Sequence, residues 1–138
     1  MDSNTITITA IVSANNKKVW DYYTKPEHIT QWNFADSSWH CPKAENDLKV
    51  GGTYKARMEA KDGSFGFDFE AVYDEIVEGK KIVYTITDGR KVVVTFDGQN
   101  GKTEVTVTFE AETLNPREMQ KSGWQAILNN FKSYTESN

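Results

Sequence analysis

The side chains suited to nucleophilic catalysis are few in this sequence, and their spacing does not favour a catalytic dyad. A cysteine or serine nucleophile needs a base to take its proton, and only His28 and His40 can supply an imidazole. His40 precedes the sole cysteine, Cys41, but neighbours in an extended segment point to opposite faces. His28 belongs to a short helix, where we expect it to be exposed. We therefore assign no catalytic residue.

The same residues argue against a bound metal or nucleotide. Adjacent strand residues cannot easily share one ion, and no other cysteine or suitably spaced histidine joins His40 and Cys41. The segment 98–103, GQNGKT, superficially resembles a phosphate-binding loop but lacks two of the four spacer residues of that motif. It lies between two alternating segments, so an Asn-Gly hairpin turn explains it. We expect neither a metal nor a cofactor.

Acid-base chemistry would need a buried carboxylate with a raised pKa. Asp68 and Glu70 are candidates by position, but they alternate with Phe67 and Phe69 and so belong to the opposite face of a strand. Arg57 is out of phase with apolar neighbours in the same way. We expect all three charged groups to face solvent on the outer surface of a sheet.

The aromatic residues are more informative, because they exceed what an aliphatic core would need. Inward-facing aromatic side chains usually pack against one another, although they also line the cavities that hold apolar ligands. The residues alone leave both interpretations open. The set comprises Trp32, Trp39, Tyr54, Phe67, Phe69, Tyr84 and Trp124.

Strands must position most of these side chains. Residues 5–12 alternate strictly between apolar residues and mostly threonine, which predicts a half-buried strand. From Trp39 onward the period is again two, interrupted by turn signals at 51–52, 62–63, 88–89 and 100–101. On the most aromatic strand, Phe65, Phe67 and Phe69 should look into a core or cavity. The pattern predicts about six or seven antiparallel strands.

Helices should complete the fold. Ser13 or Asn15 can cap a short helix around Trp20, and Pro26 suits the first turn of a second one that ends near Trp32. After Pro116, apolar residues recur at helical spacing over some five turns, which predicts a long amphipathic C-terminal helix. Such a helix is the one element large enough to cover the apolar face of the sheet. The fold class is therefore α+β, with a curved sheet wrapped around the C-terminal helix.

Length, charge and cysteine content indicate the number of domains, the classes of partner and the cellular compartment to expect. The 138 residues are expected to form one domain, 1–138, large enough for its own core. A net charge of -4 gives no attraction for nucleic acid or anionic membranes. The N-terminal segment lacks the plan of a signal peptide, and a lone cysteine is compatible with a reducing compartment. We therefore expect a cytoplasmic protein.

Five segments together resemble a known family. They are the strand at 5–12 with the Trp20 helix, residues 26–32, the VGGTY segment at 50–54, the turn at 62–63, and residues 122–128. In order and spacing they resemble homologues of the heat-shock-protein-90 ATPase activator C-terminal domain, in the START-like, polyketide-cyclase or helix-grip (SRPBCC) superfamily. The resemblance covers nearly the whole chain, and it implies the helix-grip fold.

The resemblance also implies a function. Members of the superfamily typically hold apolar or amphipathic small molecules between the long helix and the sheet, and a minority catalyse cyclisation or dehydration there. Activator proteins engage the chaperone through an additional N-terminal domain, for which this sequence leaves no room before the first strand. We expect non-enzymatic binding of a hydrophobic or aromatic molecule. A small cyclase, dehydratase or hydrolase is the first alternative, and a chaperone-associated stress-response protein is the second.

The expected cavity combines the aromatic residues with apolar residues of the strands and the C-terminal helix. Tyr54, Tyr84 and His40 would supply the polar contacts that orient a ligand. The full set of expected cavity residues is Trp32, Trp39, His40, Tyr54, Met58, Phe67, Phe69, Tyr84, Trp124, Ile127 and Phe131.

Overall fold

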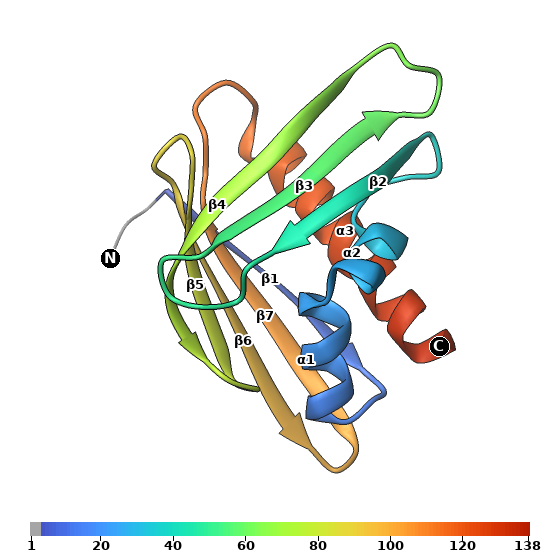
Figure 1. Cartoon of the computed structure of the whole chain (residues 1–138), viewed down its shortest axis with the longest axis vertical. Helices are drawn as coiled ribbons and strands as arrows, with labels where there is room; N and C mark the ends of the chain where they lie inside the picture. The colour runs from blue at the N-terminus through green and yellow to red at the C-terminus, as the bar shows by residue number, and fades with distance from the viewer. Residues whose placement is uncertain (1–3) are drawn as a thin grey trace.

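An antiparallel sheet organises the chain, and the computed structural model describes residues 4–138. Within those residues the sheet has seven strands in the spatial order β1-β7-β6-β5-β4-β3-β2 (Figure 1). The first three residues, part of the segment compared with a signal peptide, lie outside the described residues. The strands are β1 Thr5–Val12, β2 Trp39–Asn46, β3 Thr53–Ala60, β4 Gly66–Val77, β5 Lys81–Ile86, β6 Lys91–Gln99 and β7 Lys102–Glu110.

Three helices accompany the sheet within the described residues. They are α1 Asn16–Thr24, α2 Pro26–Trp32 and α3 Arg117–Ser137. The side chain of Asn15 caps α1 by accepting a hydrogen bond from the Lys18 backbone N–H at 2.9 Å, and Pro26 occupies the first turn of α2. The predicted α+β helix-grip architecture is confirmed, with two short helices after the first strand and a long one at the end. None of the helices is both long and apolar enough to cross a membrane.

Tight turns explain the simple order of the central strands. Between β6 and β7, Asn100 and Gly101 have φ values of 53° and 78°, the left-handed conformation that a two-residue hairpin turn requires. The Asn-Gly pair predicted this turn, and the structure confirms it. The segment that superficially resembled a phosphate-binding loop is therefore a connection between strands.

The sheet is strongly curved, and irregular pairing contributes to the curvature. β4 is 12 residues long and pairs with β3 over its first part and with β5 over its second. Its pairing with β5 shifts register between Tyr73 and Glu75, as at a β-bulge, which increases the local twist. The sheet consequently curls around α3, while α1 and α2 lie beside the open side of the curve (Figure 1).

Helix α3 lies in the concave side of the sheet and packs most extensively against β1. Its residues Leu128 and Phe131 are buried, and Phe131 contacts the rings of Tyr23 from α1 and Trp32 from α2 at centroid distances of 5.0 Å each. These edge-to-face contacts join all three helices into one apolar layer. The helix expected to cover the sheet does so.

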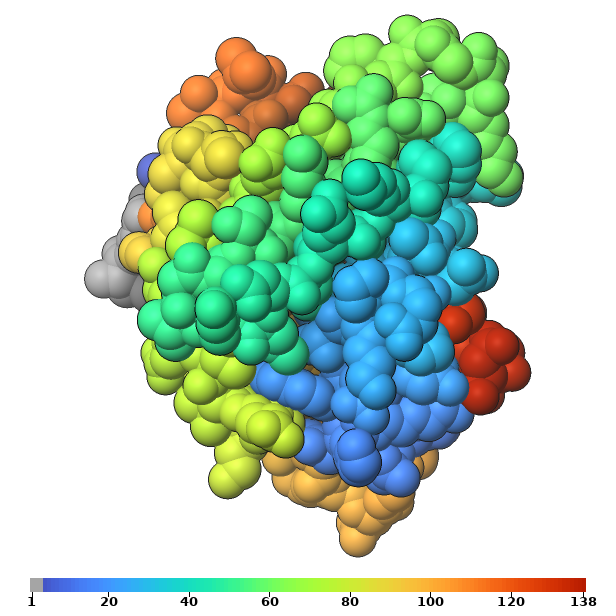
Figure 2. All heavy atoms as spheres, in the orientation of Figure 1, coloured from blue at the N-terminus to red at the C-terminus, as the bar shows by residue number. Residues whose placement is uncertain are grey.

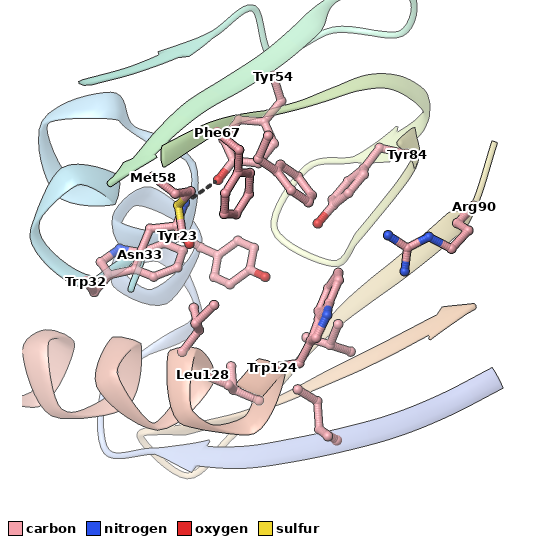
Figure 3. Close-up of a pocket in the computed structure, with 14 residues that line it drawn as sticks. Tyr23, Trp32, Asn33, Tyr54, Met58, Phe67, Tyr84, Arg90, Trp124 and Leu128 are labelled. Carbon is pink, nitrogen blue, oxygen red and sulfur yellow. Dashed lines mark hydrogen bonds between the residues drawn. The ribbon is translucent and has the colours of Figure 1, made fainter. Parts of the chain in front are cut away.

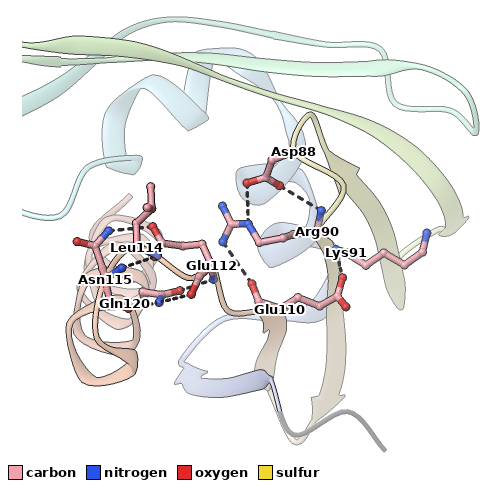
Figure 4. A network of polar contacts seen from close by, with 8 residues as sticks. All are labelled: Asp88, Arg90, Lys91, Glu110, Glu112, Leu114, Asn115 and Gln120. Atoms are coloured by element: carbon pink, nitrogen blue, oxygen red, sulfur yellow. Dashed lines mark hydrogen bonds and ion pairs between the residues drawn. The ribbon is translucent and has the colours of Figure 1, made fainter.

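A polar network joins the β7–α3 connection to the first turn of α3. The Gln120 side chain accepts a hydrogen bond from the Glu112 backbone N–H at 2.9 Å and donates to the Glu112 carbonyl at 3.0 Å (Figure 4). The Glu112 carboxylate accepts from the backbone N–H groups of Leu114 and Asn115 at 2.9 and 2.6 Å. These bonds satisfy backbone groups of the connection that precedes the helix. They hold the β7–α3 connection against the first turn of α3.

The β3–β4 hairpin extends beyond the rest of the molecule, which corrects one expectation. Phe65 precedes β4 and is 62% exposed, although it was predicted to look into a core or cavity, whereas Phe67 is 42% exposed but still borders the cavity described below. Their phase in the alternation is as predicted, but α3 does not reach the hairpin tip. Figure 2 shows this tip and the β7–α3 connection as two separate projections at the same end of the molecule.

Candidate functional site

A cavity of about 250 Å³ lies between α3 and the inner face of the sheet. Its wall is largely apolar and aromatic, and it receives side chains from all three helices, from β1, β3, β4, β5 and β7, and from the β5–β6 turn (Figure 3). The lining residues are Ile8, Tyr23, Trp32, Asn33, Tyr54, Met58, Phe67, Phe69, Tyr84, Arg90, Val107, Trp124, Ile127 and Leu128.

Strand pairing explains how the sheet supplies its part of this wall. Met58 on β3 is directly opposite Phe67 on β4, and Tyr54 lies on the same face of β3 four residues away. Phe69 extends toward Tyr54, Tyr84 and Trp124, with centroid distances between 5.8 and 6.5 Å. Because side chains alternate along a strand, these residues share the concave face. Phe69 thereby joins the sheet to α3 at the centre of the wall.

Trp124 forms the helical side of the cavity. Its indole stacks on the ring of Phe109, with the centroids 4.0 Å apart and the planes at 10°. Phe109 lies on β7 and is fully buried, so the stack fixes the orientation of Trp124. Ile127 and Leu128 follow one turn later on the same side of α3 and complete this wall.

Three tyrosines provide polar groups inside this apolar enclosure. The Tyr54 hydroxyl accepts a hydrogen bond from Asn33 Nδ2 at 3.4 Å, whereas those of Tyr23 and Tyr84 have no hydrogen-bond partner among residues 4–138. Figure 3 shows the latter two hydroxyls directed into the cavity. Burial raises the pKa of all three tyrosines well above the ordinary value of 10.0. They are consequently protonated at neutral pH and can donate hydrogen bonds to a ligand.

A cation lies at one end of the cavity. The Arg90 side chain extends from the β5–β6 turn toward Tyr84 and Trp124 (Figure 3), and it is 23% exposed. Asp88 in the same turn accepts from Arg90 Nε at 2.8 Å. The cavity thus combines an aromatic interior with one charged group near solvent.

The structure brings together eight of the eleven residues expected at the site. These are Trp32, Tyr54, Met58, Phe67, Phe69, Tyr84, Trp124 and Ile127. Trp39, His40 and Phe131 lie elsewhere. Trp39 contacts Phe65 and Phe67 at the β3–β4 hairpin, with ring centroids 5.9 and 6.1 Å away, and Phe131 is enclosed among the helices.

His40 lies on the outer face of the sheet. Its Nε2 is 3.6 Å from a carboxylate oxygen of Glu59 on β3, while Cys41 is buried and contacts the Lys43 carbonyl at 3.5 Å. The two neighbours point to opposite faces, as the strand geometry predicted, and this is why His40 cannot orient a ligand inside. Among the described residues, no group of three or more His, Cys, Asp or Glu side chains could hold a metal ion.

The other charged candidates also have structural explanations. Arg57 forms ion pairs with Glu59 at 2.8 Å and with Asp68 at 3.6 Å on the outer face, where both arginine and aspartate were expected. Glu70 does not line the cavity. His28, expected to be exposed, is half-buried instead, because its ring stacks on Tyr22 at 3.9 Å and its Nδ1 lies 2.8 Å from the Tyr134 hydroxyl.

Six cavity residues were not singled out from the sequence as site residues. Ile8 and Val107 belong to the inward phase of predicted strands, and Leu128 lies four residues after Trp124 on the predicted helix. A stricter use of these periodicities would have found them. Tyr23 lies at helical spacing from Val19, whereas Asn33 and Arg90 gave no periodic signal, and only the tertiary fold brings the first two helices and the β5–β6 turn to the cavity.

Comparison with known proteins places this architecture in a family. The family described as Activator of Hsp90 ATPase homolog 1-like protein matches residues 13–136. The solution structure of the AHSA1-like protein from Aeromonas hydrophila is 40% identical over 96% of this chain and 92% of that one, with a TM-score of 0.91. A protein from Cytophaga hutchinsonii is 51% identical over 99% of this chain and 94% of that one, with a TM-score of 0.84. No curated protein matches the chain significantly. From the extent of the family match and these identities, the chain belongs to the family of activator of Hsp90 ATPase homolog 1-like proteins.

Proposed function

We propose that this protein binds a hydrophobic or aromatic small molecule in the cavity and does not transform it. The observation that carries the proposal is the pair of unpartnered hydroxyls, those of Tyr23 and Tyr84, directed into an otherwise apolar space. Both hydroxyls reach accessible space inside the cavity, where an oxygen atom of a ligand would provide a hydrogen-bond partner. The lone Cys41 fits a reducing compartment, so the proposed setting is the cytoplasm.

The size of the cavity supports a small ligand. Ligand sites typically measure roughly 300 to 1,000 Å³, so a cavity of about 250 Å³ is slightly smaller than that range. An apolar cavity of about 150 Å³ in another protein is large enough for benzene. One aromatic ring with a short substituent therefore fits the space better than a sterol or a long acyl chain.

The cavity offers little for an enzymatic reaction. Among the described residues that line it there is no aspartate, glutamate or histidine, the groups that usually transfer protons near neutral pH. The tyrosine hydroxyls cannot replace them as bases, since burial raises the pKa of Tyr23, Tyr54 and Tyr84. These observations favour binding over a cyclase, dehydratase or hydrolase activity.

The exposed hairpin supports one second candidate, a chaperone-associated role. Phe65 and Phe67, with Trp39 beside them, form an aromatic surface at the β3–β4 tip. Exposed aromatic clusters often mark protein contacts. Purified Hsp90 would be tested against the wild-type chain and a Phe65→Ser variant. Hsp90 binding that weakens in the variant would favour this role, and absence of binding by the wild-type chain would eliminate it.

The four tryptophans allow a direct test of the proposed cavity. Trp32 and Trp124 line it, whereas Trp20 and Trp39 do not and serve as internal controls. Titration with small aromatic compounds, followed by the ¹H–¹⁵N indole signals, should shift Trp32 and Trp124 and leave the other two in place. A shift confined to Trp39, or equal shifts of all four signals, would contradict binding in the cavity.

A thermal-shift screen would find the compounds for this titration. A ligand present at about 100 times its dissociation constant adds about 2.7 kcal/mol to the free energy of unfolding. For a chain of 138 residues this corresponds to a rise in melting temperature of about 9 °C. A chemically broad set of small aromatic compounds without any stabiliser would overturn the proposal.

A further inference from the structure

Among the described residues that line the cavity, Arg90 alone has a permanent charge, and its partners leave part of its guanidinium unused. Nε donates to Asp88 Oδ2 at 2.8 Å, and Nη1 donates to the Glu110 carbonyl at 3.2 Å (Figure 4). Nη2 makes no hydrogen bond or ion pair with any residue from 4 to 138. An arginine has five N–H donors and cannot accept, so the unused donors require acceptor atoms.

The neighbouring carboxylates do not supply those acceptors. The Glu110 carboxylate accepts from the Lys91 backbone N–H at 2.6 Å, and the Glu112 carboxylate is engaged by Asn115, at 2.6 Å by its backbone N–H and at 2.8 Å by its side chain. Among the described carboxylates, only Asp88 is within ion-pairing distance of the guanidinium, through Nε, and its side chain is 51% exposed, while Glu112 interacts with Arg90 through charge at longer range. Because the Asp88 carboxylate is exposed and screened by water, it neutralises Arg90 only in part, and Nη2 remains available to a second anion.

The position of Arg90 relative to the aromatic wall is the second observation. Figure 3 shows its guanidinium directed toward Tyr84 and Trp124, at the end of the cavity opposite Trp32 and Asn33. Tyr84 adds a hydroxyl donor beside this cation. A ligand that spans the cavity thus meets an apolar interior at one end and a cluster of donors at the other.

We infer that the cavity selects small aromatic carboxylates, with the carboxylate on Arg90 and Tyr84 and the ring against Phe69, Trp124 and Leu128. This inference rests on the proposed function and specifies its ligand class. The partly exposed Arg90 keeps the anionic head close to water, which limits the cost of its desolvation. Charge-assisted hydrogen bonds to a guanidinium are stronger than those a neutral oxygen would form.

A matched pair of probes tests the inference. 3-Phenylpropionate and 3-phenylpropan-1-ol have the same ring and chain and differ in the charged head. Both would be titrated by calorimetry at pH 7.5 and by the indole signals of Trp32 and Trp124. We expect the acid to bind the wild-type chain at least about tenfold more tightly than the alcohol.

Two arginine variants separate the local contact from the overall charge. Arg90→Gln should weaken binding of the acid far more than binding of the alcohol and so abolish the preference, and the indole signals of Trp32 and Trp124 in the variant show whether the cavity is intact. Arg57→Gln removes the same charge from the outer face of the sheet and should retain the preference. If Arg90→Gln does not fold, Asp88→Asn is informative, because it removes the negative charge that competes with a ligand for Arg90 and should tighten binding of the acid.

The outcomes distinguish the inference from the function on which it rests. Equal affinities for acid and alcohol, with both shifting the cavity tryptophans, would overturn the carboxylate class and retain the binding function. A preference for the acid that survives in Arg90→Gln would overturn the role of Arg90, as would an Asp88→Asn variant that binds the acid no better than wild type. If neither probe shifts Trp32 or Trp124, both proposals fail for ligands of this size.

Discussion

Replacing two aromatic residues of α3 by alanine tests whether the cavity is real space or packed core. Phe131 is 0% exposed and touches Tyr23 and Trp32 edge to face. Trp124 has the larger ring, but it packs on Phe109 and borders the cavity on another side. By size alone Trp124→Ala should be the more destabilising change, whereas the structure predicts the opposite order.

The magnitudes follow from what each ring touches. Phe131→Ala removes a fully buried ring and leaves a closed void, for which losses of about 3 to 5 kcal/mol are usual. Trp124→Ala loses its stack on Phe109, worth about 0.5 to 1.5 kcal/mol, together with part of the transfer free energy of the indole. It enlarges an existing space instead of creating a closed void, so we expect a loss of about 2 kcal/mol.

Urea denaturation of both variants, with extrapolation to water, would measure the two losses under identical conditions. Unchanged slopes against urea concentration would show that both variants still unfold in one cooperative step. A loss for Trp124→Ala equal to or larger than that for Phe131→Ala would refute the reasoning, since the indole would then fill core space. The same experiment with a bound aromatic ligand should show little stabilisation of Trp124→Ala.

Three further changes have contrasting expected effects. Tyr73→Phe should reduce the free energy of unfolding by about 1 to 3 kcal/mol, because the Tyr73 hydroxyl donates a hydrogen bond to Asn46 at 2.6 Å. Tyr84→Phe should change the free energy of unfolding little, since the Tyr84 hydroxyl has no protein partner among residues 4–138. Urea denaturation measures both, and equal losses would contradict this difference in hydrogen bonding. Gly123→Ala should stabilise the protein by about 0.5 to 1 kcal/mol, because a methyl group there meets open space and alanine favours the helix; a lower melting temperature would show otherwise. The pKa of Glu136 lies below its ordinary value of 4.5 because Lys132 donates to it, so its contribution to stability is present above that value and lost as the pH falls through the folded-state pKa. Glu136→Gln should therefore lose less stability than wild type between about pH 6 and pH 3 in acid titrations followed by circular dichroism.

The fold was accessible from the sequence because its signals are periodic and local. Alternation in residues 5–12 and after Trp39 predicted the strands, and Asn100-Gly101 predicted a hairpin turn that the φ values confirm. The helical spacing after Pro116 predicted α3. Each of these signals depends on a single helix, strand or turn and on which of its sides faces solvent. They can therefore be interpreted without knowing which other elements it packs against.

The ends of the aromatic strand were less predictable, since alternation assigns a face but not what covers that face. Phe69 and Phe67 share one face of β4, yet Phe69 meets Trp124 while Phe67 is partly exposed. The difference arises from the length of the β3–β4 hairpin relative to α3. Sequence periodicity does not show how far a helix such as α3 extends along the strands that it covers.

His40 and Arg90 show why the polar groups of the candidate site were harder to predict than its walls. His40 was chosen for its chemistry, but the phase of β2 directs it outward to Glu59. Arg90 follows the turn at Asp88-Gly89, and no periodicity assigns a face to a turn residue. The sheet and α3 fix an apolar space, while the charged contact comes from a turn whose side chains can change without altering the strands. On this reasoning, members of the fold that share the aromatic wall can prefer different ligands according to the residue at this turn. An Arg90→Leu variant should favour neutral aromatic compounds over acids. Comparing its preference with that of the wild-type chain tests whether the turn residue determines which polar group of a ligand is accepted, while the aromatic wall binds the ring.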